Sequence, residues 1–184
     1  AYKCALDEQV DFKGAFDWIY RYEKSFDKGS EFAGTNEAFL NAIKDAIPAI
    51  RQINIDTKNN EFTAQIKMSK DDEPYWLTYD MMSAGFKAMI NITAEIAHRC
   101  IELNGFLGLE AVKKTPGIVM IDEVDLYLHP HWQQHILSDL QTAFPEIQFI
   151  VTTHSPFIVQ SVKSKNVITL DGVKGDSNPD MRSI

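Results

Sequence analysis

The sequence predicts an α/β fold whose core is a parallel β-sheet with helices on its faces. Two short apolar segments, at 118–121 and 147–153, are separated by a helical pattern at 131–144. Strands that are apolar on both faces and are joined through a helix are typical of parallel sheets buried between helices. A further apolar segment at 166–170 is predicted as a third strand of the same sheet.

Two amphipathic helices are predicted ahead of this core. Residues 11–26 and 35–47 both carry apolar side chains at helical spacing. Thr35 or Asn36 can cap the second helix with its side chain, and Pro48 is expected to end it.

A β-hairpin is predicted after the second helix. Apolar and polar residues alternate at 53–55 and at 62–68, and the segment "TKNN", which is typical of a turn, lies between them. Residues 74–78 are expected to add a third strand. We therefore expect residues 1–78 to form a lobe of helices and antiparallel strands.

The character of the sequence changes near residue 80. Residues 83–103 predict one long helix, and the connector after it has room for one short helix before the first core strand. We expect residues 79–170 to form the α/β core and the polar residues 171–184 to form a flexible tail.

The composition limits the classes of partner. The 184 residues have a formal net charge of −8, which disfavours a broad phosphate-binding surface. The segment thus gives no support for DNA binding, which is left to other parts of a larger protein. No apolar run approaches the roughly 20 residues that span a bilayer, and Cys4 and Cys100 lack the spacing of a zinc or disulfide motif. We expect a cytoplasmic protein with no membrane contact.

Two carboxylates directly follow the first core strand. Asp122 and Glu123 come after the apolar residues 118–121, and ligands of α/β sheets bind at the carboxyl ends of the strands. In the functional interpretation, Asp122 binds Mg²⁺, directly or through water, and Glu123 orients and polarises an attacking water molecule. The alternative is a pair of acids that cap the next helix or bind an arginine.

A histidine follows the second core strand. His154 should emerge at the same sheet edge as Asp122 and Glu123, where it can hydrogen-bond a terminal phosphate or a leaving oxygen. The alternative is that His154 only caps the turn before Pro156.

The start of the long helix is a third candidate site. Ser83, Ala84 and Gly85 combine a small hydroxyl with a residue that allows close approach, and the free N–H groups of a helix start attract anions. Serine is also common at helix starts that bind nothing.

Together, the segments "MSAGFK", "GIVMIDEVDLYLHP" and "FIVTTHSP" resemble motifs of ATP-binding-cassette (ABC) ATPases. In this order they are similar to the signature motif, to Walker B with the D-loop, and to the switch-histidine motif. The resemblance is to the soluble RecF/SMC-like branch, and most of all to the bacterial "AAA family" ATPases. That group includes the overcoming-lysogenisation-defect, Septu and retron-associated anti-phage ATPases. The resemblance covers most of the chain, is strongest over 79–159, and implies the fold of a P-loop ATPase head.

The resemblance also implies a composite ATP site between the head domains of a homodimer. Asp122, which holds Mg²⁺, would act with Glu123 and His154 of one protomer, while Ser83 and Gly85 of the other protomer contact the ATP phosphates. Binding of ATP would close the dimer and hydrolysis would release it. Such a switch would act on a nuclease or another effector, in anti-phage defence or DNA maintenance.

The sequence departs from the family pattern at three places. The usual LSDG or LSGG is Met-Ser-Ala-Gly here, at 82–85. The D-loop reads Leu128-His129-Pro130, with His129 in place of the aspartate of transporter-type cassettes, as is typical of the RecF-like branch. The phosphate-binding pattern GxxxxGK[ST] does not occur, because its nearest match, "GSEFAGTN" at 29–36, lacks the lysine and follows a helix. We expect the Walker A half to lie N-terminal to these 184 residues.

The remaining histidines have two interpretations. His131 and His135 are spaced like two ligands of a helical zinc site, but the pattern HExxH is absent. A structural role for His129, His131 and His135 in the D-loop and the next helix is favoured, and Trp132 is expected to pack this helix onto the sheet.

Two other functions stay open at this point. One is an interaction or regulatory module that uses the same fold without hydrolysing ATP. The other is a metal-dependent phosphoesterase that uses the four side chains Asp122, Glu123, Asp125 and His154.

Overall fold

The computed structural model describes residues 34–56, 59 and 61–170. The helix predicted at 11–26, most of the "GSEFAGTN" segment and the tail at 171–184 lie outside the described residues.

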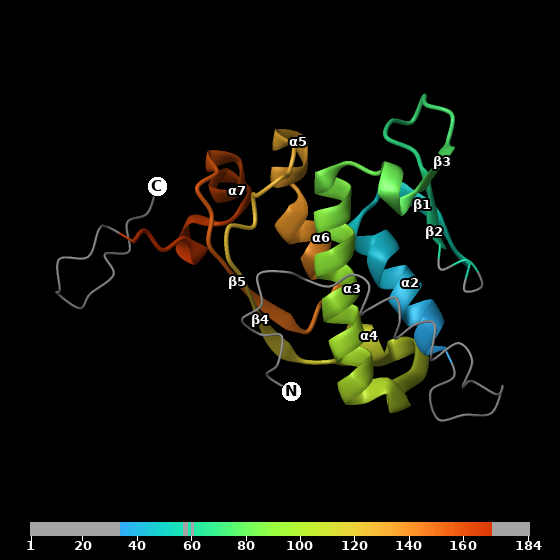
Figure 1. Ribbon diagram of the computed structural model, residues 1–184. Coiled ribbons are helices and arrows are strands. Elements are labelled where there is room, and N and C mark those ends of the chain that lie inside the picture. The colour runs from blue at the N-terminus through green and yellow to red at the C-terminus, as the bar shows by residue number, and fades with distance from the viewer. Residues whose placement is uncertain (1–33, 57–58, 60, 171–184) are drawn as a thin grey trace.

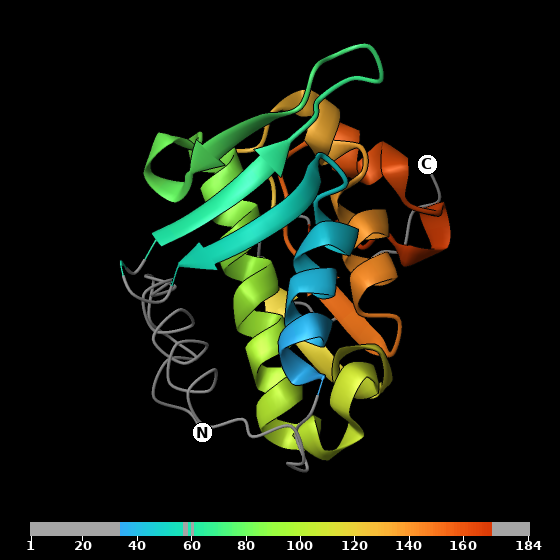
Figure 2. The same ribbon diagram turned by 90° about the vertical axis from the view of Figure 1, so that its right-hand side faces the viewer.

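The first part of the described chain is a helix followed by a small antiparallel sheet (Figure 2). Helix α2 (Thr35–Ala46) leads into the strands β1 (Ile50–Asp56), β2 (Glu61–Ile66) and β3 (Tyr75–Thr78). The strands pair in the order β1-β2-β3, and both pairs are antiparallel. The hairpin and the third strand predicted from the alternating pattern are therefore present.

The start of α2 differs from the prediction. Neither Thr35 nor Asn36 caps the helix, because the N-cap residue is Gly34, which has a φ of 90°. A β-carbon on Gly34 would lie 3.1 Å from the backbone nitrogen of Leu109, so the segment after α3 packs closely against this turn. Thr35 is buried as the first residue of the helix.

Helix α3 (Ala84–Asn104) is the central helix of the molecule (Figure 1). It begins after the 3₁₀ turn η1 (Tyr79–Met81) and is followed by η2 (Gly105–Glu110) and the short helix α4 (Ala111–Lys114). Its apolar residues recur at helical spacing and join the buried core, as the periodicity predicts. The helix therefore holds its N-terminal residues in a fixed place relative to the rest of the core.

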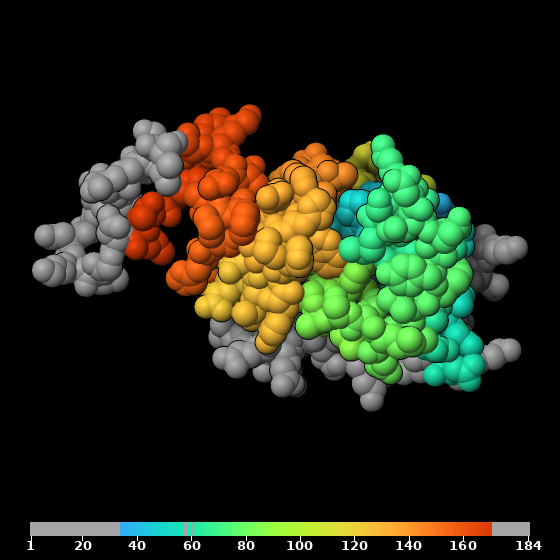
Figure 3. All heavy atoms as spheres, turned by 90° about the horizontal axis from the view of Figure 1, so that it is seen from above, coloured from blue at the N-terminus to red at the C-terminus, as the bar shows by residue number. Residues whose placement is uncertain are grey.

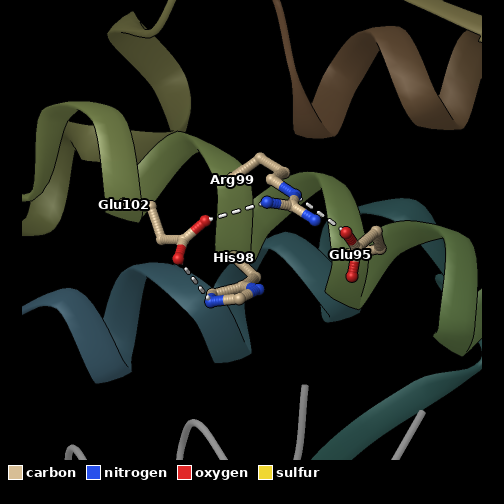
Figure 4. A network of polar contacts seen from close by, with 4 residues as sticks. All are labelled: Glu95, His98, Arg99 and Glu102. Atoms are coloured by element: carbon tan, nitrogen blue, oxygen red, sulfur yellow. Dashed lines mark hydrogen bonds and ion pairs between the residues drawn. The ribbon is translucent and has the colours of Figure 1, made fainter. Parts of the chain in front are cut away.

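A group of polar contacts lies along α3 (Figure 4). Arg99 contacts Glu95 at 2.8 Å and Glu102 at 3.2 Å, and His98 lies 3.6 Å from Glu102. Burial lowers the pKa of His98, and the neighbouring acids oppose this shift only in part. Ion pairs spaced three or four residues apart stabilise a helix by about 0.2–0.5 kcal/mol each, so the two pairs made by Arg99 support α3 modestly.

The second part of the chain contains the predicted parallel sheet. Strands β4 (Gly117–Ile121) and β5 (Ile147–Val151) pair in parallel, from Gly117 opposite Ile147 to Ile121 opposite Val151. Helices α5 (Pro130–Gln133) and α6 (Ile136–Ala143) connect them, and α7 (Pro156–Ser161) and η3 (Ser164–Asn166) follow β5. Helix α2 packs against both α3 and α6, which joins the two parts of the described chain around one core.

Two predictions for this region were wrong. The single helix expected at 131–144 is divided, because His135 has a non-helical backbone with a φ of −121° and its carbonyl accepts hydrogen bonds from Ser138 and Asp139. The strand expected at 166–170 is not formed. Ile168 and Leu170 are exposed there, and residues 166–170 pair with no strand among the described residues.

Within the described ranges, no helix is both long enough and apolar enough to cross a bilayer.

The turn at Gly34 gives a testable prediction about stability. Gly34→Ala should lower the free energy of unfolding by about 1–2 kcal/mol, because a side chain is disfavoured at positive φ and would also press on Leu109. Gly117→Ala is the matched control, since a β-carbon there meets no atom within 4 Å. Urea unfolding of both variants measures the difference. Equal unfolding midpoints would show that the turn tolerates a side chain.

Candidate functional site

The ends of the two parallel strands are joined by a threonine. The hydroxyl of Thr152 donates a hydrogen bond to Oδ1 of Asp122 and accepts one from the backbone N–H of Glu123 over 2.8 Å. The backbone of Thr152 also pairs with Ile121 and Val124, at 3.0 Å each. The carboxyl end of β4 is thus fixed to the carboxyl end of β5, with Asp122 at the junction.

Glu123 has an unusual backbone and an exposed side chain. Its φ is 46°, in the left-handed region that residues with side chains rarely adopt. The turn leaves Asp122 and Glu123 exposed and buries Val124. Strained backbone of this kind is concentrated at functional sites and is kept only where the surroundings enforce it. Here the hydrogen bonds from Glu123 and Val124 to Thr152 help to hold this backbone conformation.

Asp125, just before the D-loop, forms hydrogen bonds with the loop after β5 that contains His154 (the histidine loop). Its Oδ1 accepts hydrogen bonds from the hydroxyl of Thr153 at 2.5 Å and from the backbone N–H of His154 at 3.3 Å. Burial acts to raise the pKa of Asp125, but these hydrogen bonds outweigh it and hold the pKa below its usual value. The ionised carboxylate of Asp125 therefore stabilises the folded arrangement of these loops.

His154 is exposed at the same sheet edge as Asp122 and Glu123. The cap of α7 is the next residue, Ser155, whose hydroxyl accepts the N–H of Phe157 over 3.1 Å. The alternative in which His154 serves as a turn cap therefore does not hold. The pairing of β4 with β5 therefore places the backbone of His154 at the same end of the sheet as Asp122 and Glu123.

The start of α3 lies at this same end of the molecule as α5 and α7 (Figure 1). Ser83 caps the helix, its hydroxyl accepting the N–H of Phe86 over 3.4 Å, and Ser83 and Ala84 are exposed. Gly85 is buried, and a β-carbon on it would lie 2.8 Å from the carbonyl oxygen of Tyr127. The glycine is thus required by packing against the D-loop of its own chain.

The D-loop residues are held from several sides. Leu128 is buried, His129 caps α5 by accepting the N–H of His131 at its Nδ1, and Pro130 is the first residue of that helix. Trp132 was expected to pack on the sheet. Its ring instead meets Phe86 of α3 edge-on, with 4.4 Å between the ring centroids.

His131 and His135 contact each other rather than the strand ends. Their ring centroids are 5.4 Å apart, and both line a cavity of about 270 Å³ beside Trp132. Among the described residues, no group of three or more His, Cys, Asp or Glu side chains has the arrangement of a metal site.

Asp122 is the residue that suits a Mg²⁺ ion in the company of a nucleotide. Its carboxylate is exposed, and only Oδ1 has a hydrogen bond among the described residues. Mg²⁺ in phosphate-transfer sites takes one or two carboxylates together with phosphate oxygens and water, so a single oriented carboxylate is compatible with it.

Comparison with known proteins identifies the class of this chain. Residues 11–160 match the family described as "AAA domain, putative AbiEii toxin, Type IV TA system". The match covers most of the chain, and the chain belongs to this family of AAA-type ATPases. The resemblance inferred from the three sequence motifs is thereby confirmed, as is the fold of an ATPase head.

Individual relatives place the chain more narrowly. The retron Vc95 probable ATPase of Vibrio cholerae serotype O1 biovar El Tor is 45% identical over 86 residues, which are 47% of this chain and 16% of that protein. The retron Ec83 probable ATPase of Escherichia coli is 33% identical over 145 residues, 77% of this chain and 25% of that protein. The Septu protein PtuA of Bacillus thuringiensis is 34% identical over 110 residues, 58% of this chain and 26% of that protein. The chain therefore spans a quarter or less of the retron relatives and about a quarter of the Septu protein.

The sequence interpretation missed two residues at this site. Thr152 was treated only as part of the strand end, although its hydroxyl joins β4 to β5. Gln133 was given no role, although its side chain bonds both the D-loop and Ser155. A hydroxyl residue immediately after an apolar strand and a glutamine shortly after "LHP" were the available signals.

The lowered pKa of Asp125 predicts a dependence of stability on pH. A depressed carboxyl pKa contributes stability above the pKa of the unfolded chain, about 3.9, and the contribution is lost as the pH falls through the folded value. Asp125→Asn should therefore destabilise the protein near pH 7 and matter progressively less below about pH 4. Denaturant unfolding at several pH values measures this. Asp139→Asn is a control of opposite sign, because burial raises the pKa of Asp139. A destabilisation by Asp125→Asn that does not change with pH would contradict the assignment.

Proposed function

We propose that this chain is the C-terminal part of an ATP-binding and ATP-hydrolysing ABC-type head domain. The observation that carries the proposal is the junction of two parallel strands at which Thr152 orients Asp122 and the backbone of Glu123, in a chain of the AAA family. His154 lies at the same edge and completes a set of side chains suited to phosphate chemistry.

Each residue has a role that follows from its position. Asp122 would hold Mg²⁺, which when bound neutralises charge on the phosphates. Glu123, exposed on its strained turn, would accept a hydrogen bond from water and direct it at the terminal phosphate. His154 would donate a hydrogen bond to an oxygen of that phosphate.

Ser83 would act on the ATP of a second protomer. It is exposed at the start of a 21-residue helix, where a hydroxyl and free N–H groups suit a phosphate. Gly85 is buried by its own D-loop, so its contribution to the phosphate is limited to the backbone and to the shape of the turn. Two such heads would close on ATP and open after hydrolysis.

The exposed face of the parallel sheet supports a larger head. Ile118, Met120 and Ile150 are 66%, 78% and 46% exposed, although they belong to the central strands of the fold. A two-stranded sheet is marginally stable by itself, and exposed apolar strands favour coverage by further structure. We propose that this face receives the half of the head that carries the phosphate-binding loop.

The biological role follows from the relatives. Two are named as retron probable ATPases and one as a Septu protein, and we propose that this chain likewise serves anti-phage defence in the cytoplasm. ATP-driven closure of the dimer would then control a nuclease or another effector. The phosphoesterase alternative loses support, because Oδ1 of Asp125 already bonds Thr153 and His154.

Glu123→Gln in the full-length protein is the main test. The change keeps the size of the side chain but removes the charge that polarises water, so ATP turnover should fall by roughly two to four orders of magnitude while ATP binding survives. The closed dimer should then accumulate. Turnover, ATP affinity and dimer fraction are measured together. Loss of binding with little change in turnover per bound ATP would refute the role of Glu123.

Two further variants sharpen this test. Asp122→Asn should weaken Mg²⁺-dependent ATP binding itself, in contrast to Glu123→Gln. Glu146→Gln is a matched control, because Glu146 is exposed immediately before β5, at the opposite end of the sheet. It should leave both binding and turnover unchanged.

The isolated 184-residue chain should bind ATP weakly and hydrolyse it negligibly. The reason is that its sequence contains no GxxxxGK[ST] loop to hold the β- and γ-phosphates. A steady-state phosphate-release assay measures the turnover. A rate of about 1 per second or more, within the range of working enzymes, would show that the phosphates bind elsewhere in this chain.

A further inference from the structure

The side chain of Gln133 connects two loops that are far apart in the sequence. Its Nε2 donates to the carbonyl oxygen of Leu128 at 2.9 Å and to that of Asp125 at 3.3 Å. Its Oε1 accepts the hydroxyl of Ser155 at 2.6 Å. The two carbonyls can only accept and this hydroxyl can donate, so the orientation of the amide follows from its partners. The amide nitrogen and the amide oxygen of Gln133 therefore both form hydrogen bonds.

The partner of Gln133 in the histidine loop is itself part of a network. Ser155 is buried, its hydroxyl accepts the N–H of Phe157 while donating to Gln133, and its N–H donates to Thr153. Gln133 is therefore bonded to the residue that caps α7 and that directly follows His154.

The same D-loop contacts the start of α3 on its other side. The carbonyl oxygen of Tyr127 faces Gly85, and Trp132, the neighbour of Gln133, packs edge-on against Phe86. Figure 3 looks onto this end of the molecule. The amber segment that holds the D-loop and α5 lies between the green start of α3 and the red-orange loop that contains His154.

We infer that Gln133 is a positioning residue that keeps the D-loop and the histidine loop in one fixed arrangement. This inference rests on the proposed function for its catalytic consequence. The segment 125–133 contacts the start of α3, which would act on the partner's ATP, and the loop of His154, which would act on the protomer's own ATP. Gln133 thereby couples the two ATP sites of the dimer.

The chemistry of the site requires an amide at this position. A glutamate of the same shape has no N–H to donate and would place negative charge beside two carbonyl oxygens. A methionine of similar length makes neither kind of hydrogen bond. Gln134 provides a matched control, because it is exposed and its side chain forms no hydrogen bond with the described residues.

The first test measures the arrangement itself, in the full-length protein without nucleotide. Amide hydrogen exchange is compared for Gln133→Glu, Gln133→Met and Gln134→Met. We expect exchange at Leu128 and Phe157 to accelerate by about tenfold in both Gln133 variants, the scale of one lost hydrogen bond, and to stay unchanged in Gln134→Met. Exchange in the β1–β2 hairpin is the internal reference for overall folding. Unchanged exchange at both loops would overturn the inference.

The second test asks whether Gln133 acts through His154. ATP turnover is measured for Gln133→Met, for His154→Ala and for the double variant. If Gln133 positions His154, its substitution should lower kcat about tenfold in the native background and have little further effect once His154 is absent. A role confined to stability would lower kcat by the same factor in both backgrounds, and that result would overturn the inference.

The two proposals can fail separately. A full-length native protein that does not hydrolyse ATP refutes the proposed function and the coupling of ATP sites, while the exchange measurement still decides whether Gln133 joins the loops. An active native protein whose Gln133 variants exchange and turn over normally refutes only the role of Gln133.

Discussion

The parallel pairing of β4 with β5 is the constraint on which the candidate site depends. Because Ile121 lies opposite Val151, the residues that follow each strand emerge side by side. Thr152 extends this pairing past the strand ends with its backbone and its hydroxyl. The paired strands therefore hold the site in place, although its residues are about thirty positions apart in the sequence. The hydrogen bonds from the N–H groups of Glu123 and Val124 to Thr152 also help to hold the strained backbone of Glu123.

The segment that contains the D-loop follows this junction in the sequence and contacts the start of α3. Asp125 uses its carboxylate to hold Thr153 and His154, and Gln133 holds the backbone of the loop from the opposite side. The carbonyl of Tyr127 then meets Gly85. Three motifs that are separate in the sequence therefore share one continuous set of contacts. A displacement at one motif has to be accommodated by the other two, as expected of a close-packed interior.

Features that follow from apolar periodicity could be predicted from the sequence. Features that depend on a single polar contact or on the backbone of one residue could not. The hairpin, the long helix α3 and the parallel pair of strands follow from the pattern of apolar residues along the sequence. The break at His135 and the Gly34 cap do not, because each depends on backbone geometry at one residue. Asp122, Glu123 and His154 were predicted to lie at one edge of the sheet because the ends of neighbouring parallel strands lie side by side. Thr152 and Gln133 could not, since a hydroxyl or an amide has value only through a partner distant in the sequence.

The departure of the signature motif from LSGG has a physical explanation in the same contacts. Met82 and Gly85 are buried, whereas Ser83 and Ala84 are exposed. At Gly85 a β-carbon would press on the backbone of the D-loop, so only glycine fits there. At Ala84 no such limit applies, and an added methyl group is tolerated by the fold. The start of α3 therefore requires glycine at position 85 because of packing within the chain, whereas the exposed position 84 places no such requirement on its residue.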